Sequence, residues 1–339
     1  MTYVRMHSTR VVYLLILAAI GIAIFTRGPS PEEAAPGANV GAQAPIGYRA
    51  FNSTSYWNAS VQAWPVASRS NEMIKWLQST NPLPYMRLVG TESTGGWGEP
   101  VYWTQVTDKR YAVRATRYGL PPEFTNPGVR IPRGARPAAT ADGQMTIFDL
   151  SDGTVYKLHR AVYSSATDTW SAGGGSIYYL DSNGIQGKLP GSDEPRNRGH
   201  RGYPPGTHSV RYDEVLAGQI SHALKITLNT SCKSPNYVWP GAGSDGDSLD
   251  ANCIPQGARL RLKPSYVFPT SLPPAARVIA TALQRHGVVV GDSGPSMTLK
   301  VENTVAEGRG WLWAGLLKKD SLGSIPLSAF EVIEPGYHF

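Results

Sequence analysis

Cysteine and charged side chains are both scarce in this chain. Two cysteines occur among 339 residues, and they lack the paired spacing of a zinc site. Charged residues make up 17%, and the net charge of +7 falls to +4 once Arg5, Arg10 and Arg27 are set aside. So weak and dispersed a positive charge does not form the concentrated basic face that nucleic-acid binding requires. We therefore expect no nucleic-acid partner.

Sequence motifs that would fix a reaction are absent as well. The chain has no Gly-x-Ser-x-Gly, no His-Glu-x-x-His and no P-loop, so the serine-hydrolase, zincin and NTPase interpretations lose their usual support. No repeat with the period of a solenoid or a propeller is present either. Only weaker features remain to indicate the function.

Glycine, proline and aromatic residues are abundant by contrast. The chain contains 36 glycines and 27 prolines, which favour many turns, together with 17 tyrosines and 9 tryptophans. Many turns with few charges are typical of β-rich exported proteins. We therefore predict a mainly β fold, an antiparallel β-sandwich of the jelly-roll or concanavalin-like type with two or three peripheral helices. Residues 49–339 are long enough to form it as a single domain.

One apolar run lies near the N-terminus. Residues 11–25 are uncharged and follow two arginines, an order that sends the rest of the chain across the membrane. The run is shorter than the roughly 20 residues of a full span, but a poor cleavage junction follows it. Residues 1–27 are thus predicted to be a signal-anchor or a signal peptide, and residues 28–48 a flexible linker. We expect an extracytoplasmic protein, either membrane-anchored by residues 11–25 or secreted after cleavage.

The two cysteines are predicted to form a disulfide. Cys232 and Cys253 flank a segment rich in glycine, serine and aspartate that reads as a loop. Two separately buried thiols are the alternative, but exported proteins favour the bridge. Closing a loop of this length contributes about 3 kcal/mol in the chain-entropy model.

Periodicity and turn residues predict three helices and a series of strands. The helices are expected over residues 71–78, 212–217 and 273–285. Residues 101–106 and 111–116 are predicted to pair as a hairpin. Further strands are expected over residues 144–150, 154–162, 176–181, 220–228, 258–263, 288–292 and 297–303.

The strongest hairpin signal is Asp152-Gly153, which lies between two alternating segments. A two-residue turn at this point places Ile147 opposite Leu158, with both side chains facing the core. Lys157 and His159 then lie together on the polar face of the hairpin, where they can line a cleft.

Several long segments of the chain resemble an uncharacterised family of exported actinobacterial β-sandwich proteins that are associated with carbohydrates. The segments include FNSTSYWNASVQAWP, RYDEVLAGQISHALKITL and IPQGARLRLKP, and the similarity covers most of residues 51–335. The resemblance implies a coherent β-sandwich and assigns no catalytic residues. Members of the family carry an acidic residue where this chain has Lys157, which argues against a carboxylate-based mechanism at that position.

His222 is the most unusual polar residue, because the alternation in SHALKITL puts it on an otherwise apolar strand face. One interpretation is a core histidine that bonds a backbone carbonyl. The other is a general acid or base close to Asp149, Lys157 and His159, which form the rest of the predicted catalytic group. Lys157 and His159 can also neutralise a uronate carboxylate, as lyases that cleave polysaccharides by β-elimination require, or they can belong to a solvated face.

Trp97, Trp239 and Arg259 are the predicted substrate-binding residues, because aromatic rings stack on the apolar faces of sugars. These features together predict an exported enzyme acting on a polysaccharide or cell-wall glycan, either a glycoside hydrolase or a polysaccharide lyase. A non-catalytic carbohydrate-binding or cell-wall structural protein is the alternative.

A cluster of aspartates raises the question of calcium. Asp245, Asp247 and Asp250 lie close in sequence, and hard cations prefer grouped carboxylates. The spacing departs from an EF-hand loop at its glycine. We therefore predict no metal or other cofactor, with calcium as the alternative.

Overall fold

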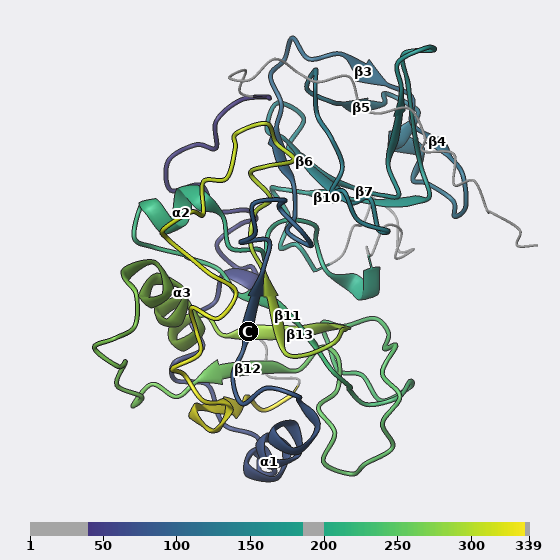
Figure 1. Cartoon of the computed structure of the whole chain (residues 1–339). Coiled ribbons are helices and arrows are strands. Elements are labelled where there is room, and N and C mark those ends of the chain that lie inside the picture. Colours follow the sequence, from purple (N-terminus) through teal and green to yellow (C-terminus); the bar gives the residue numbers. More distant parts are fainter. Residues whose placement is uncertain (1–39, 186–199, 336–339) are drawn as a thin grey trace, which may run out of the picture. The chain divides into compact units, whose positions relative to one another are not determined.

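The computed structural model describes residues 40–185 and 200–335 (Figure 1). The predicted export segment, residues 11–25, and most of the predicted linker lie outside this part of the chain. The described residues form a mainly β structure with several sheets and three α-helices. None of these helices is long and apolar enough to cross a membrane.

The larger sheet has six strands and is mixed. Its order is β1 (Arg87–Val89), β14 (Thr298–Lys300), β11 (Leu224–Leu228), β13 (Val288–Ser293), β12 (Arg259–Leu262) and β15 (Phe330–Val332). One face of this sheet packs against α1 (Ser70–Thr80), α2 (Tyr212–Leu216) and α3 (Pro274–Arg285). Alternate residues of the strands supply the buried apolar side chains, as expected for a sheet with one face on a core.

The second sheet has four strands. Its order is β10 (Gly174–Tyr179), β7 (Thr154–His159), β6 (Met145–Asp149) and β2 (Val101–Trp103). Two small sheets accompany it, β3 (Arg110–Tyr111) with β5 (Val129–Arg130), and β4 (Arg114–Ala115) with β9 (Thr169–Ala172) and β8 (Val162–Ser164). Short 3₁₀ turns lie at η1 (Tyr56–Asn58), η2 (Pro122–Phe124), η3 (His200–Gly202) and η4 (Leu327–Ala329).

The two larger sheets share one apolar cluster. Phe148 on β6 and Val155 on β7 belong to the same buried group as Val289 on β13. The other face of β6 and β7 contributes Ile147 and Leu158 to a separate core with the small sheets. The mainly β prediction is therefore confirmed, with a shared core between the two larger sheets.

The strand directions differ from the predicted antiparallel arrangement. Four pairs are parallel: β1 with β14, β11 with β13, β2 with β6, and β4 with β9. The predicted hairpin of residues 101–106 with 111–116 is wrong, because β2 pairs with β6 and not with the following segment. Packing explains this choice, since the Trp103 ring stacks on Phe148 with 4.3 Å between centroids.

The β6–β7 hairpin forms, but with a longer loop than predicted. Met145 pairs with Leu158 and Asp149 with Thr154, which leaves residues 150–153 in the loop. The Asp149 carboxylate closes this loop, because it accepts hydrogen bonds from Ser151 Oγ (2.6 Å) and the Asp152 N–H (3.2 Å). Every cross-strand partner shifts by two positions from the prediction. An even shift preserves the faces of the strands, so the predicted core face is retained.

The predicted helices are present with small corrections. Helix α1 begins at Ser70, one residue before the predicted start, and the Ser70 hydroxyl accepts a hydrogen bond from the Val332 N–H of β15 (2.9 Å). The strand predicted over 220–228 begins only at Leu224, because Ala223 N–H donates to Trp57 O (2.7 Å) outside the sheet. His222 therefore precedes the strand and is not on its face.

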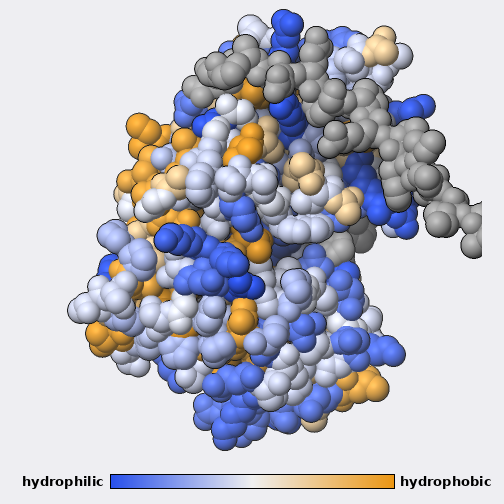
Figure 2. Space-filling model, in the orientation of Figure 1, coloured by the Kyte–Doolittle hydropathy of each residue, from blue (hydrophilic) through white to orange (hydrophobic). Residues whose placement is uncertain are grey.

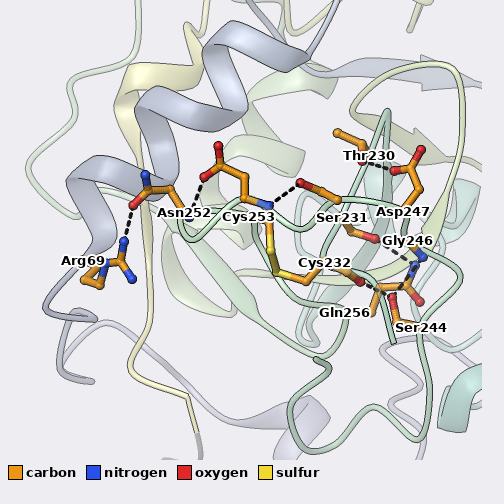
Figure 3. Close-up of a disulfide and its surroundings, with 12 residues drawn as sticks. Arg69, Thr230, Ser231, Cys232, Ser244, Gly246, Asp247, Asn252, Cys253 and Gln256 are labelled. Carbon is orange, nitrogen blue, oxygen red and sulfur yellow. Dashed lines mark hydrogen bonds between the residues drawn. A yellow bond between two sulfur atoms is a disulfide. The ribbon is translucent and has the colours of Figure 1, made fainter. Parts of the chain in front are cut away.

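The predicted disulfide is present, with 5.1 Å between the Cα atoms of Cys232 and Cys253 (Figure 3). Both cysteines belong to the core beneath the helices. Arg69, just ahead of α1, donates a hydrogen bond of 2.5 Å to Asn252 beside the bridge. The disulfide loop is thus held by the core and by the residue that precedes α1.

Candidate functional site

A polar pocket lies on the face of the six-stranded sheet that faces away from the helices. Lys225 and Thr227 on β11 line it, together with Thr298 and Lys300 on β14. The residues between them in each strand belong to the apolar core on the opposite face. Simple alternation along two neighbouring strands therefore gathers two lysines at one place.

A bulge in β13 adds an acidic group to the pocket. Ile226 pairs with Val290, but Thr227 pairs with Asp292, so Gly291 is an extra residue in the strand. Val290 faces the helix-covered core, and without the extra residue Asp292 would face the same way. The bulge turns Asp292 to the pocket side instead.

The opposite side of the pocket is supplied by Lys157 on β7 and by Glu99 just ahead of β2. The Lys157 ammonium donates to both Glu99 oxygens (3.1 and 3.3 Å), and the Thr146 hydroxyl donates to one of them (2.7 Å). Burial acts to raise the pKa of Glu99, but the charges of Lys157 and Lys300 and these hydrogen bonds outweigh it. The pKa of Glu99 falls to about 2, so this carboxylate is ionised at neutral pH.

Lys225 has an unusual protonation equilibrium. Burial, and then the like charges of Lys157 and Lys300, lower the pKa of its ammonium to about 8, against the attraction of Asp292 and Glu99. No hydrogen bond from its side chain occurs among the described residues, and its Nζ lies 5.6 Å from the centroid of the Tyr203 ring. Burial lowers the pKa of Lys300 as well, but Lys300 donates a hydrogen bond to Gln144 (3.2 Å). Lys225 is therefore the lysine best placed to exchange a proton with a ligand.

His208 also lines the pocket. Its backbone carbonyl accepts the Lys225 N–H (3.1 Å), which holds it beside β11. The ring nitrogen Nδ1 lies 3.2 Å from Ala223 O; a carbonyl only accepts, so Nδ1 carries the proton. Burial holds the pKa of His208 well below its usual value, so the ring is neutral. Its Nε2 is buried without a hydrogen-bond partner among the described residues.

This pocket, the lysine pocket, is small and carries an excess of positive charge. Three ammonium groups (Lys157, Lys225 and Lys300) face two carboxylates (Glu99 and Asp292). The cavity volume is about 30 Å³, enough for roughly two water molecules or one small anionic group. Such a site can bind a carboxylate and exchange a proton at Lys225.

A second small pocket contains paired carboxylates. Arg309 donates to Glu302 (2.6 Å) and to Glu307 (2.9 Å), and Glu307 also accepts the Val101 N–H (2.8 Å). Burial, and then the charge of Glu302, raise the pKa of Glu307 well above its usual value. These groups form hydrogen bonds with one another and with the backbone, which indicates a structural role for this second pocket.

Of the predicted catalytic residues, the structure places Lys157 in the lysine pocket and the others elsewhere. His222 is buried, with Nδ1 2.9 Å from Ala223 O and Nε2 3.0 Å from Glu214. Asp149 is fully buried and bonded to Arg130 (2.8 Å). Both residues thus serve internal clusters and line neither of the two pockets described above. His159 ends β7, two positions beyond Lys157, and pairs with Gly174.

The predicted substrate-binding residues are dispersed. Arg259 is buried and donates to the backbone carbonyls of Tyr56 and His286 (both 2.8 Å), so its guanidinium binds the chain itself. Trp239 is 38% exposed and packs edge-on against Tyr56, and Trp97 is 46% exposed. The two tryptophans are partly exposed, whereas Arg259 is buried.

The aspartates considered for calcium bind separate partners. Asp245 forms an ion pair with Arg201 (2.7 Å) and Asp247 accepts a hydrogen bond from Thr230. Asp250 accepts the Asn252 N–H (2.7 Å). Among residues 40–185 and 200–335, no group of three metal-binding side chains occurs.

Sequence reasoning missed most of the pocket: Glu99, His208, Lys225, Asp292 and Lys300. The alternation in ALKITL did contain a signal, since it puts Lys225 and Thr227 opposite the apolar residues. The sequence prediction selected His222 instead, because that histidine was expected on the apolar face of the strand. The bulge at Gly291, which brings Asp292 to the same face, has no signature in the sequence beyond the glycine itself.

No protein-family model, curated protein or solved structure matches this chain. The resemblance to exported, carbohydrate-associated proteins therefore stays a prediction.

Proposed function

We propose that this chain is an exported protein that acts on a polysaccharide, and that the lysine pocket binds an anionic group of the glycan. The observation that supports this best is the convergence of Lys157, Lys225 and Lys300 on one pocket. The cavity is too small for a whole sugar ring, but its size suits a carboxylate or sulfate substituent.

In this proposal the two larger sheets are the layers of a β-sandwich, and the pocket lies between their facing sides. The shared cluster of Phe148, Val155 and Val289 supports the layered arrangement. The lysine pocket is lined from both sheets, by Lys157 on one and Lys225 on the other.

Exposed aromatic rings support a glycan over a small anion. Trp97, Trp239 and Trp311 are 46%, 38% and 49% exposed, and exposed tryptophan rings stack on sugar faces. On the face seen in Figure 2, hydrophobic residues gather around α2, where Leu216 is 61% exposed. The aromatic rings would supply contacts along the polymer, and the pocket would supply the charge selectivity.

The alternative is a carbohydrate-binding or cell-wall structural protein without catalysis. The small volume of the pocket fits this alternative, because binding requires only a charged substituent to enter. The two functions share the same ligand and differ in turnover.

Binding of anionic and neutral glycans by the full chain tests the proposal. We expect polyuronates or sulfated glycans to bind and their uncharged counterparts to bind at least about 10-fold more weakly, since one lost charged contact costs roughly 1.5–3 kcal/mol. Affinity should fall with added salt. Lys157→Met should weaken binding, whereas Lys318→Met, at an exposed lysine outside the pocket, should not. Equal affinity for charged and neutral glycans, or no binding to any of them, would refute the proposal.

A further inference from the structure

We propose that the substrate is a glycan containing uronic acid and that Lys225 is the base of a β-elimination that cleaves it. The inference rests on the function proposed above and adds the reaction and the residue. It follows from the position of three lysines around a single cavity, with only one of them lacking a hydrogen-bond partner among the described residues.

A β-elimination needs cations that neutralise the carboxylate and a base that accepts the C5 proton. The proton at C5 of a uronate becomes acidic only when positive charge neutralises the neighbouring carboxylate, which gains electron density as the proton leaves. A neutral base must then be close enough to accept that proton. Lys157 and Lys300, which are held by hydrogen bonds to Glu99 and Gln144, are fixed positive groups. They are suited to neutralising the carboxylate.

Lys225 is suited to accepting the C5 proton. Its side chain rises from β11 beside Gly291, where a Cβ would lie only 2.5 Å from Lys225 Cδ and 2.7 Å from Cγ. The glycine of the bulge therefore makes room for this lysine. The charged groups that act on its ammonium are Lys157, Asp292, Lys300 and Glu99, in that order. Together with burial, these charges lower the pKa of Lys225 to about 8, so its neutral amine form is populated near that pH.

The reaction balances without a co-reactant. The neutral Lys225 amine takes the C5 proton, and the electron pair of that C–H bond forms a C4=C5 double bond. The bond from C4 to the glycosidic oxygen breaks, and this oxygen leaves with its electron pair. The Lys225 ammonium then returns the proton to the departing oxygen. The products are one new reducing chain end and one unsaturated uronate.

The test uses the full chain with polygalacturonate, alginate and glucuronan, each beside its carboxyl-reduced form. Two readings are taken together: the ultraviolet absorbance of the conjugated double bond and the number of reducing ends. We expect both to rise in step for at least one polyuronate and neither to rise for any reduced form. The rate should increase with pH through about 8 as the Lys225 amine loses its proton.

Two substitutions at the base separate charge from proton transfer. Lys225→Arg keeps the positive charge but cannot act as a base near neutral pH. We expect it to lower the elimination rate at least about 100-fold while polyuronate binding changes little. Lys225→Met should lower the rate equally, and its near-ultraviolet circular dichroism should match that of the unsubstituted chain. Lys318→Met should retain full activity.

Distinct results would overturn the inference while leaving the proposed function intact. Reducing ends without ultraviolet absorbance would show hydrolysis. Binding of polyuronates without any turnover would show a binding protein, and selective binding of sulfated glycans would show a different substrate class. Full elimination activity in Lys225→Arg would show that another group is the base. Failure to bind any anionic glycan would instead overturn the proposed function itself.

Discussion

At the scale of single residues, Lys225 combines a desolvated charge with few compensating contacts. Buried ammonium groups that lack partners cost stability, because water solvates the charge better than the protein does. Natural proteins retain such groups where function requires them. The fully bonded His222 is the opposite case, because both ring nitrogens are satisfied by Glu214 and Ala223 O.

Replacing Lys225 should therefore stabilise the protein while abolishing its activity. The pKa of Lys225 is lower in the folded state than its usual value of 10.5, so the unfolded chain binds the proton more tightly between about pH 8 and 10.5. The unfolding free energy of the unsubstituted chain thus rises with pH across this window. We expect Lys225→Met to gain roughly 3 kcal/mol at pH 7, since each unit of pKa corresponds to about 1.4 kcal/mol, and to lose that part of the pH dependence. Urea unfolding at pH 7 and at pH 10.5 measures both effects, and a destabilised Lys225→Met at pH 7 would contradict the account.

At the scale of elements, the bulge in β13 sets the geometry of the pocket. Gly291→Ala should push the Lys225 side chain aside, because the added Cβ would lie 2.5 Å from its Cδ. We expect turnover to fall by about 10²-fold, and the pH profile of the remaining activity to shift as Lys225 moves relative to Asp292. Gly243→Ala is the matched control, since nothing lies within 4 Å of a Cβ at that position. If the two variants are equally active, the bulge does not position the base.

Individual elements also show how far the sequence predicts the structure. Helices α2 and α3 and strands β12 and β13 follow from local periodicity and turn residues, because these signals lie within a few residues of each other. The pairing of β2 with β6 depends on the stacking of Trp103 on Phe148, a contact between distant segments. The pocket likewise depends on Glu99, Lys157 and Lys225, which no local pattern connects.

At the scale of the whole molecule, the disulfide secures the core beneath the helices. Cys232 and Cys253 are 21 positions apart, and opening such a loop should cost about 3 kcal/mol in the chain-entropy model. We expect the double variant Cys232→Ser, Cys253→Ser to lower the unfolding free energy by this amount. Urea unfolding with and without reductant measures it, since only the unsubstituted chain should respond to the reductant. An unchanged midpoint on reduction would show that the bridge adds nothing to stability.

The central claim is that the lysine pocket holds the carboxylate of a uronate. A crystal structure of the Lys225→Arg variant, soaked with the oligogalacturonate, oligoalginate or oligoglucuronan that competes best with its polymer, tests it most directly. The account predicts a sugar carboxylate within about 3 Å of Nζ of Lys157 or Lys300. An oligosaccharide bound elsewhere on the molecule, with only water in the pocket, would contradict it.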